Sequence, residues 1–200
     1  MRVTVIDYRA GNLTSVVKAF RALDAEVVVT EDPEDLRRAE RIVLPGVGHF
    51  SATQRLEETG IKAAVAETMA RQVPFLGICV GLQWLFAGST EASECAGLAA
   101  LPGSCRRFAP GKKIPHVGWN SLSIRPESRL LAGIDDGSFA YFTHSWWAPV
   151  GASTVAVTTY GEPFSAAVEQ GSVMGVQFHP EKSGETGLRV LRNFLEFPSC

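Results

Sequence analysis

Short apolar segments alternate with helical patterns through the first half of the chain, and this alternation limits the possible folds more than any other feature. Four apolar segments, which we expect to be buried strands, lie at residues 2–8, 26–30, 41–44 and 73–78. Helical patterns lie between them at residues 13–23, from an Asp32-Pro33 start, and at residues 61–72. Parallel neighbours need crossover connections, so this order predicts an α/β fold with a doubly wound, mostly parallel sheet and helices on both faces.

The second half of the chain has shorter strand-like runs separated by glycine and proline. These runs lie at residues 113–119, 122–124, 139–147, 154–159, 165–169 and 173–178. We expect an additional antiparallel or mixed section there, closed by a helix that carries Leu188, Leu191 and Leu195. No repeat, low-complexity tract or linker divides the sequence, so residues 1–200 are expected to form one domain.

Charge and apolar run lengths restrict the classes of partner. Lys and Arg number 19 against 21 Asp and Glu, a formal net charge of -2, which provides no strong positive field for nucleic acid or anionic lipid. The first apolar run is too short for a secretory signal. The stretch at residues 73–88 falls short of the roughly 20 residues that span a bilayer. We expect a cytoplasmic protein with no nucleic-acid or membrane partner.

The spacing of cysteines and histidines argues against a metal site and a disulfide framework. The chain has four cysteines without a C-x-x-C pair and four histidines without a short chelating pair. We therefore expect no metal and no cofactor.

One cysteine stands between two glycines in the segment PFLGICVGLQWLF at residues 74–86, where an expected strand runs into a helix. The pattern G-x-C-x-G presents Cys79 on a tight elbow, because glycines at 77 and 81 remove side chains that would clash. A helix N-terminus favours a thiolate, and the backbone N–H of Val80 is a candidate oxyanion donor. The motif by itself is also compatible with a small core cysteine.

The segment VQFHPE at residues 176–181 supplies a candidate base. An expected strand ends there in a histidine and a carboxylate two residues apart. Residues i and i+2 of an extended chain point to the same face, so Glu181 can hold the imidazole of His179 in one orientation and tautomer. Cys79, His179 and Glu181 therefore form a candidate catalytic triad.

These residues resemble a known family. The patterns G-x-C-x-G-x-Q at residues 77–83 and H-P-E at residues 179–181 resemble the class I (triad) glutamine amidotransferases. Further segments are similar to the glutaminase subunit of imidazole glycerol phosphate synthase, of histidine biosynthesis: DYRAGNL at 7–13, LPGVGHF at 44–50, KIPHVGWN at 113–120, YFTHS at 141–145 and HPEKS at 179–183. The chain departs from the family at Arg9 and Ala10, where a small residue and Met are usual, and at Trp146, where Tyr is more usual.

The resemblance implies hydrolysis of glutamine to glutamate and ammonia through a cysteinyl thioester, with Cys79 as nucleophile and His179 as the group that protonates the departing ammonia. The tetrahedral oxyanion needs preorganised donors, for which the candidates are Val80 and the backbone of Val47 and Gly48. The glycines of the PGVG loop at residues 45–48 permit a peptide reorientation.

The resemblance also implies contacts with substrate and partner. Gln83 and Ser145 match glutamine-contacting positions. The family places Trp119, Tyr141 and Lys182 toward a (βα)8-barrel cyclase or synthase subunit, which forms a heterodimer with the glutaminase and receives its ammonia. The chain has no segment that resembles a phosphate-binding site for the second substrate.

Other functions remain open at this point. A glutaminase subunit of another synthase, such as the one that makes pyridoxal phosphate, shares the Cys, His and Glu pattern, although KIPHVGWN and YFTHS favour histidine biosynthesis. A cysteine hydrolase or isomerase on a similar scaffold explains the elbow but not Gln83 together with HPE. A non-enzymatic regulatory module explains neither the cysteine elbow nor the combination of Gln83 with HPE.

Overall fold

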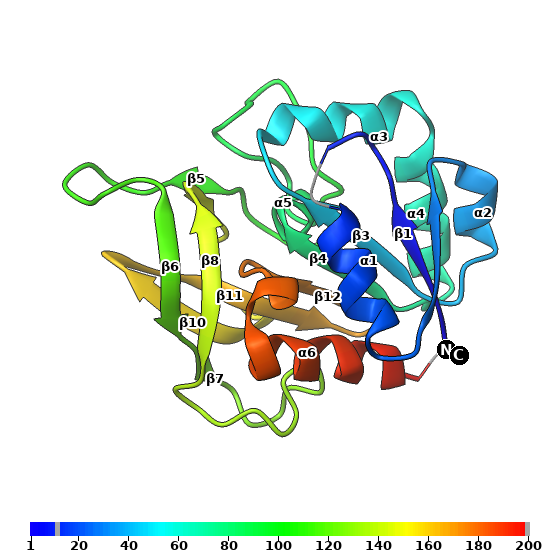
Figure 1. Cartoon of the computed structure of the whole chain (residues 1–200). Helices are drawn as coiled ribbons and strands as arrows, with labels where there is room; N and C mark the ends of the chain where they lie inside the picture. Colours follow the sequence, from blue (N-terminus) through cyan, green and yellow to red (C-terminus); the bar gives the residue numbers. More distant parts are fainter. Residues whose placement is uncertain (11–12, 199–200) are drawn as a thin grey trace.

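A mixed sheet of eight strands forms the centre of the molecule, in the order β2-β1-β3-β4-β12-β11-β10-β7 (Figure 1). The computed structural model describes residues 1–10 and 13–198. Gly11 and Asn12 of the family-like DYRAGNL segment, and Cys200, lie outside the described residues.

The N-terminal half supplies the parallel part of this sheet. Its strands are β1 (Arg2–Ile6), β2 (Glu26–Thr30), β3 (Ile42–Gly46) and β4 (Phe75–Cys79). Its helices are α1 (Leu13–Arg21), α2 (Pro33–Arg37), α3 (Gln54–Glu58), α4 (Ile61–Ala70) and α5 (Val80–Trp84), with a 3-10 turn, η1, at Phe50–Thr53. The predicted alternation is confirmed. The helical turns at residues 50–58 were not predicted, because they are too short to show a 3.6-residue period.

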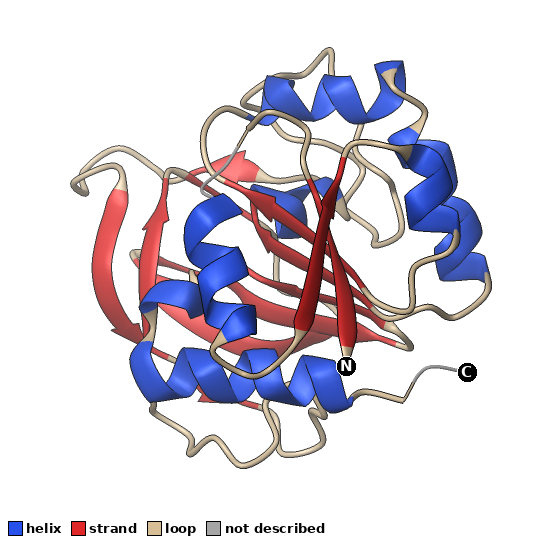
Figure 2. Ribbon diagram, turned by 45° about the vertical axis from the view of Figure 1, so that its right-hand side comes forward, coloured by secondary structure: helices blue, strands red, loops and turns tan. Residues whose placement is uncertain are grey.

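Helices cover both faces of the sheet, as Figure 2 shows. The chain runs from β1 through α1 to β2 on one side of β1, and then through α2 to β3 on the other side. Because both crossovers are right-handed and run in opposite directions along the sheet, α1 and α2 lie on opposite faces. The last helix, α6 (Gly184–Glu196), packs on α1, where the ring centroids of Phe20 and Phe194 are 6.3 Å apart. None of the described helices is long and apolar enough to cross a membrane.

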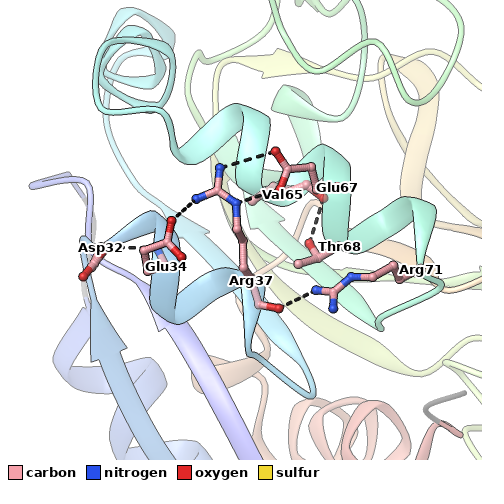
Figure 3. A network of polar contacts seen from close by, with 7 residues as sticks. All are labelled: Asp32, Glu34, Arg37, Val65, Glu67, Thr68 and Arg71. Carbon is pink, nitrogen blue, oxygen red and sulfur yellow. Dashed lines mark hydrogen bonds and ion pairs between the residues drawn. The ribbon is translucent and has the colours of Figure 1, made fainter.

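On the opposite face, polar side chains join α2 to α4 (Figure 3). Arg37 donates from Nε to Glu67 at 2.7 Å and from Nη1 to Glu34 at 2.6 Å. Asp32 caps α2 by accepting from the backbone N–H of Glu34 at 2.9 Å, and Pro33 begins the helix, as the sequence predicts. Water screens these exposed ion pairs, so they contribute little to stability. The buried apolar faces of α2 and α4 hold the two helices on the sheet.

The C-terminal half adds the antiparallel section. Its strands in the main sheet are β7 (Ser123–Ile124), β10 (Thr154–Tyr160), β11 (Glu162–Gln170) and β12 (Val173–Val176). β12 runs parallel to β4 and antiparallel to β11, so the sheet changes direction there. Two further ribbons pair β6 (His116–Ser121) with β8 (Phe139–His144), and β5 (Arg106–Arg107) with β9 (Trp146–Trp147). The predicted antiparallel or mixed section is confirmed.

The continuous strand predicted at residues 139–147 is wrong. β8 ends at His144, and β9 begins at Trp146 with a different partner strand. Ser145 forms the bend between the two ribbons. The bend could not be predicted from the sequence, because aromatic and β-branched residues lie on both sides of it and no glycine or proline marks it.

The carboxyl ends of β3, β4 and β12 meet at one edge of the sheet. Gly46 at the end of β3 pairs with Cys79 at the end of β4, and Val176 at the end of β12 pairs with Ile78. In open α/β sheets, ligands bind outside the carboxyl ends of the strands. This pairing therefore brings Cys79 close to the residues that follow β12, among them His179.

Candidate active site

Cys79 occupies a strained elbow between β4 and α5. Its φ of 55° and ψ of -105° put a non-glycine residue in a sparsely populated backbone region. A Cβ on Gly81 would overlap the carbonyl oxygen of Leu44, and a Cβ on Gly77 would overlap the backbone of Gly81. The glycines therefore allow the close contact that fixes the elbow, as the G-x-C-x-G pattern predicts.

The side chain of Cys79 opens on a cavity of about 210 Å³. Cys79 is only 3% exposed, so the expectation that it is presented rather than packed is right only toward this cavity. The lining includes five other residues selected from the sequence: Val47, Gly48, Val80, Gln83 and Ser145. Sites for drug-sized ligands measure about 300–1,000 Å³. The smaller volume here suits a molecule the size of an amino acid.

His179 and Glu181 form a buried pair beside the elbow. Nδ1 of His179 lies 2.9 Å from Oε1 of Glu181, and each side chain is 1% exposed. Burial lowers the pKa of His179, but the side chains of Cys79 and Glu181 outweigh burial and raise it to about 10. His179 is therefore an imidazolium at neutral pH. Its Nε2 has no hydrogen-bond partner among the described residues, so this nitrogen is available to the sulfur and to a substrate.

Gln177 is a polar contact of the nucleophile that the sequence analysis missed. Its Nε2 lies 3.6 Å from Sγ of Cys79, and its Oε1 accepts from Nε2 of Gln83 at 3.2 Å. Gln83 also donates to the carbonyl of Trp146 at 2.8 Å. The sequence contains a signal for this contact: Gln177 and His179 both follow β12 and are two residues apart, a spacing that puts two side chains of an extended chain on the same face.

Glu91 was also missed, and it contributes the one acidic side chain among the described residues that line the cavity. Its Oε2 accepts from the backbone N–H of Phe50 at 2.9 Å, which fixes the carboxylate. Glu91 lies in an irregular segment after α5, where no periodicity or motif distinguishes it from the other surface acids.

The three residues expected to face a partner lie together outside the cavity. Trp119 and Tyr141 are opposite each other on the β6–β8 ribbon, with ring centroids 6.0 Å apart. Nζ of Lys182 lies 6.0 Å from the ring centroid of Tyr141. Trp119 is 56% exposed, and the same ribbon exposes Val117 and Phe139. Figure 1 shows this ribbon at the end of the molecule opposite α2.

Comparison with known proteins identifies the family of the chain. Residues 4–197 match the family model described as glutamine amidotransferase class-I. The "imidazole glycerol phosphate synthase subunit HisH" of Methanothermobacter thermautotrophicus is 47% identical over 97% of this chain and 98% of that protein. The protein of the same description from Moorella thermoacetica is 45% identical over 97% and 94%.

Solved structures show the same fold at lower identity. A structure described as "crystal structure of glutamine amidotransferase" has a TM-score of 0.77 and 22% identity, covering 97% of both chains. The glutaminase domain of Trypanosoma brucei CTPS with bound acivicin has a TM-score of 0.68 and 15% identity, covering 100% of this chain and 96% of that one. These likenesses concern the fold alone.

Proposed function

Because this chain belongs to the class I glutamine amidotransferases, and within them to the HisH subunits of imidazole glycerol phosphate synthase, we propose that it is the glutaminase subunit of that synthase. The observation that carries the proposal is the Cys79 elbow, which opens on a cavity of amino-acid size and interacts with the buried His179–Glu181 pair. The match to residues 4–197 supports one amidotransferase domain over residues 1–200. We place this biosynthetic subunit in the cytoplasm.

The triad performs the hydrolysis in two steps. The Cys79 thiolate attacks the side-chain carbonyl carbon of glutamine, and the C–N bond breaks while Nε2 of His179 protonates the departing ammonia. Water, deprotonated by the now neutral His179, then breaks the thioester, and glutamate leaves. Glu181 holds Nδ1 of the ring throughout and stabilises the imidazolium that the first step requires.

Backbone donors stabilise the oxyanion of each step. Val80 follows the nucleophile at the start of α5, and Val47 and Gly48 line the same cavity from the loop after β3. Gly48 has a φ of 115°, which favours glycine, and a Cβ there would meet no atom within 4 Å, so the space beside this residue is open. We assign the oxyanion N–H groups to this loop and to Val80. Removing one such donor typically costs about 10²- to 10³-fold in rate.

Polar groups on the cavity wall recognise the rest of the glutamine molecule. Glu91 supplies a fixed negative charge for the α-ammonium group. Gln83 and Ser145 line the cavity near the bend between β8 and β9, and we assign them contacts with the glutamine substrate.

The exposed face of the β6–β8 ribbon binds the synthase subunit. Trp119, Tyr141 and Lys182 present two aromatic rings and a cation there, a composition typical of interface anchors. We propose that the partner is a (βα)8-barrel cyclase, joined in a heterodimer, which consumes the ammonia released at Cys79.

A glutamate-release assay on the chain, with and without the barrel subunit and its ribonucleotide ligand, tests the proposal. We expect weak release alone and strong stimulation by the ligand-bound partner. A matched glutaminase with its own barrel serves as the positive control. Strong release that the barrel never affects would reject the subunit assignment, and no release under any condition would reject the glutaminase itself.

A further inference from the structure

Two histidines of the KIPHVGWN and YFTHS segments take no part in the triad, yet they form a buried pair. His116 on β6 stands opposite His144 on β8, and Nδ1 of His116 lies 3.1 Å from Nε2 of His144. They are 3% and 6% exposed. Aromatic rings surround them, from Phe108, Phe142, Tyr160 and Phe164. Burial lowers the pKa of His116 to about 4 and that of His144 to about 3, so both rings are neutral at pH 7.

Only one arrangement of protons satisfies this pair. The carbonyl of Trp146 can only accept, so Nδ1 of His144, 2.8 Å away, must carry the proton. Nε2 of the neutral ring then accepts, and Nδ1 of His116 must donate to it. Nε2 of His116 in turn accepts from Nδ2 of Asn120 at 3.4 Å.

The orientation of the Asn120 amide is fixed independently. Its Nδ2 donates to the carbonyl of Thr159 at 3.1 Å, and its Oδ1 accepts from the backbone N–H of Ser121 at 2.9 Å. A chain of three hydrogen bonds, here called the relay, therefore runs from Asn120 through His116 and His144 to the carbonyl of Trp146, and each residue donates to the next.

The relay ends at residues 145–146, which line the glutamine cavity next to His144 itself and are here called the 145–146 wall. The carbonyl of Trp146 accepts from His144 and also from Gln83, and the carbonyl of Ser145 accepts from the backbone N–H of Phe108 at 3.1 Å. Because the chain changes ribbons here, the β8 ladder ends, and the side chains of His144 and Gln83 satisfy the carbonyl of Trp146.

We propose that His116 and His144 are positioning residues for glutamine binding, which act through the carbonyl of Trp146 to hold the 145–146 wall and the amide of Gln83. This inference rests on the proposed glutaminase function. The alternative is that the two rings only fill space in the aromatic cluster. Directionality separates the two ideas, because a space-filling role needs volume alone, whereas the relay needs a donor at each Nδ1 position.

Replacement of His144 by two residues of similar size tests this difference. His144→Asn keeps an N–H group near the Nδ1 position that can donate to the carbonyl of Trp146, whereas His144→Leu has none. Both variants lose the Nε2 acceptor of His116, so their comparison isolates the hydrogen bond to Trp146. In the complex with the barrel subunit and its ligand, we expect His144→Leu to raise the KM for glutamine about tenfold, with kcat changed by less than about threefold. His144→Asn should stay within about threefold of the unmodified chain in KM.

The pair His116→Leu and His116→Asn should follow the same order with smaller effects, because His116 acts one hydrogen bond further from the wall. Equal KM values for the Leu and Asn variants, or a loss confined to kcat, would overturn the proposal even though glutamate release by the unmodified complex still supports the glutaminase. Thermal midpoints and partner affinity of each variant identify effects that come from misfolding.

A second measurement works on the unmodified chain and does not depend on activity. Ring nitrogen shifts of ¹⁵N-labelled histidine report which nitrogen carries the proton. We expect the Nδ1–H tautomer for both His116 and His144 at pH 7. An Nε2–H tautomer on either ring would overturn the relay whatever the kinetic result.

Discussion

The nucleophile and its base are fixed by different forces on the two sides of the site. On the parallel side, Cys79 is held by backbone shape, because Gly77 and Gly81 allow contacts that no other residue permits. On the antiparallel side, His179 is held by hydrogen bonds: Glu181 binds its Nδ1, and the hydroxyl of Ser183 donates to its carbonyl at 2.7 Å.

This difference determines how each side connects to the surface. The hydroxyl of Ser183 also accepts from the backbone N–H of Tyr141 at 2.9 Å, and the N–H of His179 donates to the carbonyl of Tyr141 at 2.9 Å. The histidine side is therefore bonded through its backbone to the ribbon that we propose as the docking surface, whereas Cys79 contacts that ribbon more weakly, through its Sγ and the carbonyl of Thr143 at 4.0 Å. Substitution at a sterically fixed residue should cause a large loss of stability in one step. Substitutions at hydrogen-bonded residues should reduce activity by different amounts, and their contribution to stability should depend on pH.

The largest effect should come from Cys79→Ala, which removes the nucleophile and leaves the elbow glycines intact. We expect glutamate release by the complex to fall at least about 10⁴-fold, since losing a nucleophile costs this much or more in comparable triads. Stability should change little, because only one sulfur atom leaves the cavity wall. Synthesis with added ammonia should survive in an assay of the variant complex. Substantial glutaminase activity in Cys79→Ala would show that the nucleophile is wrongly assigned.

The histidine side should fail in graded steps. His179→Ala removes the group that transfers the proton, whereas Glu181→Gln removes only the charge that orients and stabilises it. We expect the loss of kcat/KM in Glu181→Gln to be about 10²-fold smaller than in His179→Ala. Steady-state kinetics of both complexes measure the difference, with partner binding checked separately. Equal losses, or a larger loss in Glu181→Gln, would contradict these roles.

The cysteine side should fail sterically in Gly81→Ala. The added methyl group would meet the carbonyl of Leu44 in β3, and a backbone atom at the centre of a sheet cannot move aside cheaply. We expect the free energy of unfolding to fall by about 3 kcal/mol in urea titrations. Gly151→Ala is the matched control, since its methyl group would meet no atom within 4 Å, and it should change stability by less than about 0.5 kcal/mol. Similar values for the two variants would refute the steric account of the elbow.

The sequence predicts those parts of the site whose residues are close together in the chain and misses those that distant segments bring together. The glycines around Cys79 and the His179–Glu181 pair are close together in the chain, at residues 77–81 and 179–181, so their spacing is visible in the sequence. Glu91 and the bend at Ser145 depend on the pairing of distant strands and loops, which leaves no local pattern. The relay of His116 and His144 depends on ribbon register, and its directions depend on a carbonyl that only the fold brings near.

The smallest effect should be a pH dependence of stability with opposite signs for the two histidine groups. Burial lowers the pKa of His144 to about 3, although the hydrogen bond to the carbonyl of Trp146 acts against it, and the charge of His179 acts in the same direction as burial. Below the ordinary histidine pKa of about 6.5, the unfolded chain therefore binds more protons than the folded chain. The stability that the relay contributes is therefore present above pH 6.5 and is lost as the pH falls. His179, whose pKa is raised to about 10, contributes stability that is present below pH 6.5 and is lost as the pH rises toward 10.

Urea titrations of the isolated chain between pH 5 and pH 9 separate these two contributions. From pH 6.5 to pH 5, His144→Asn should lose about 1 kcal/mol less stability than the unmodified chain, because the variant lacks the buried ring that resists protonation. From pH 7 to pH 9, a His179→Gln variant should lack the decline of the unmodified chain, because it has no imidazolium to discharge between Cys79 and Glu181. If both variants follow the unmodified chain on both limbs, neither histidine group contributes to stability through its charge. If the two limbs change together in one variant, the relay and the triad are a single coupled unit rather than two differently stabilised regions.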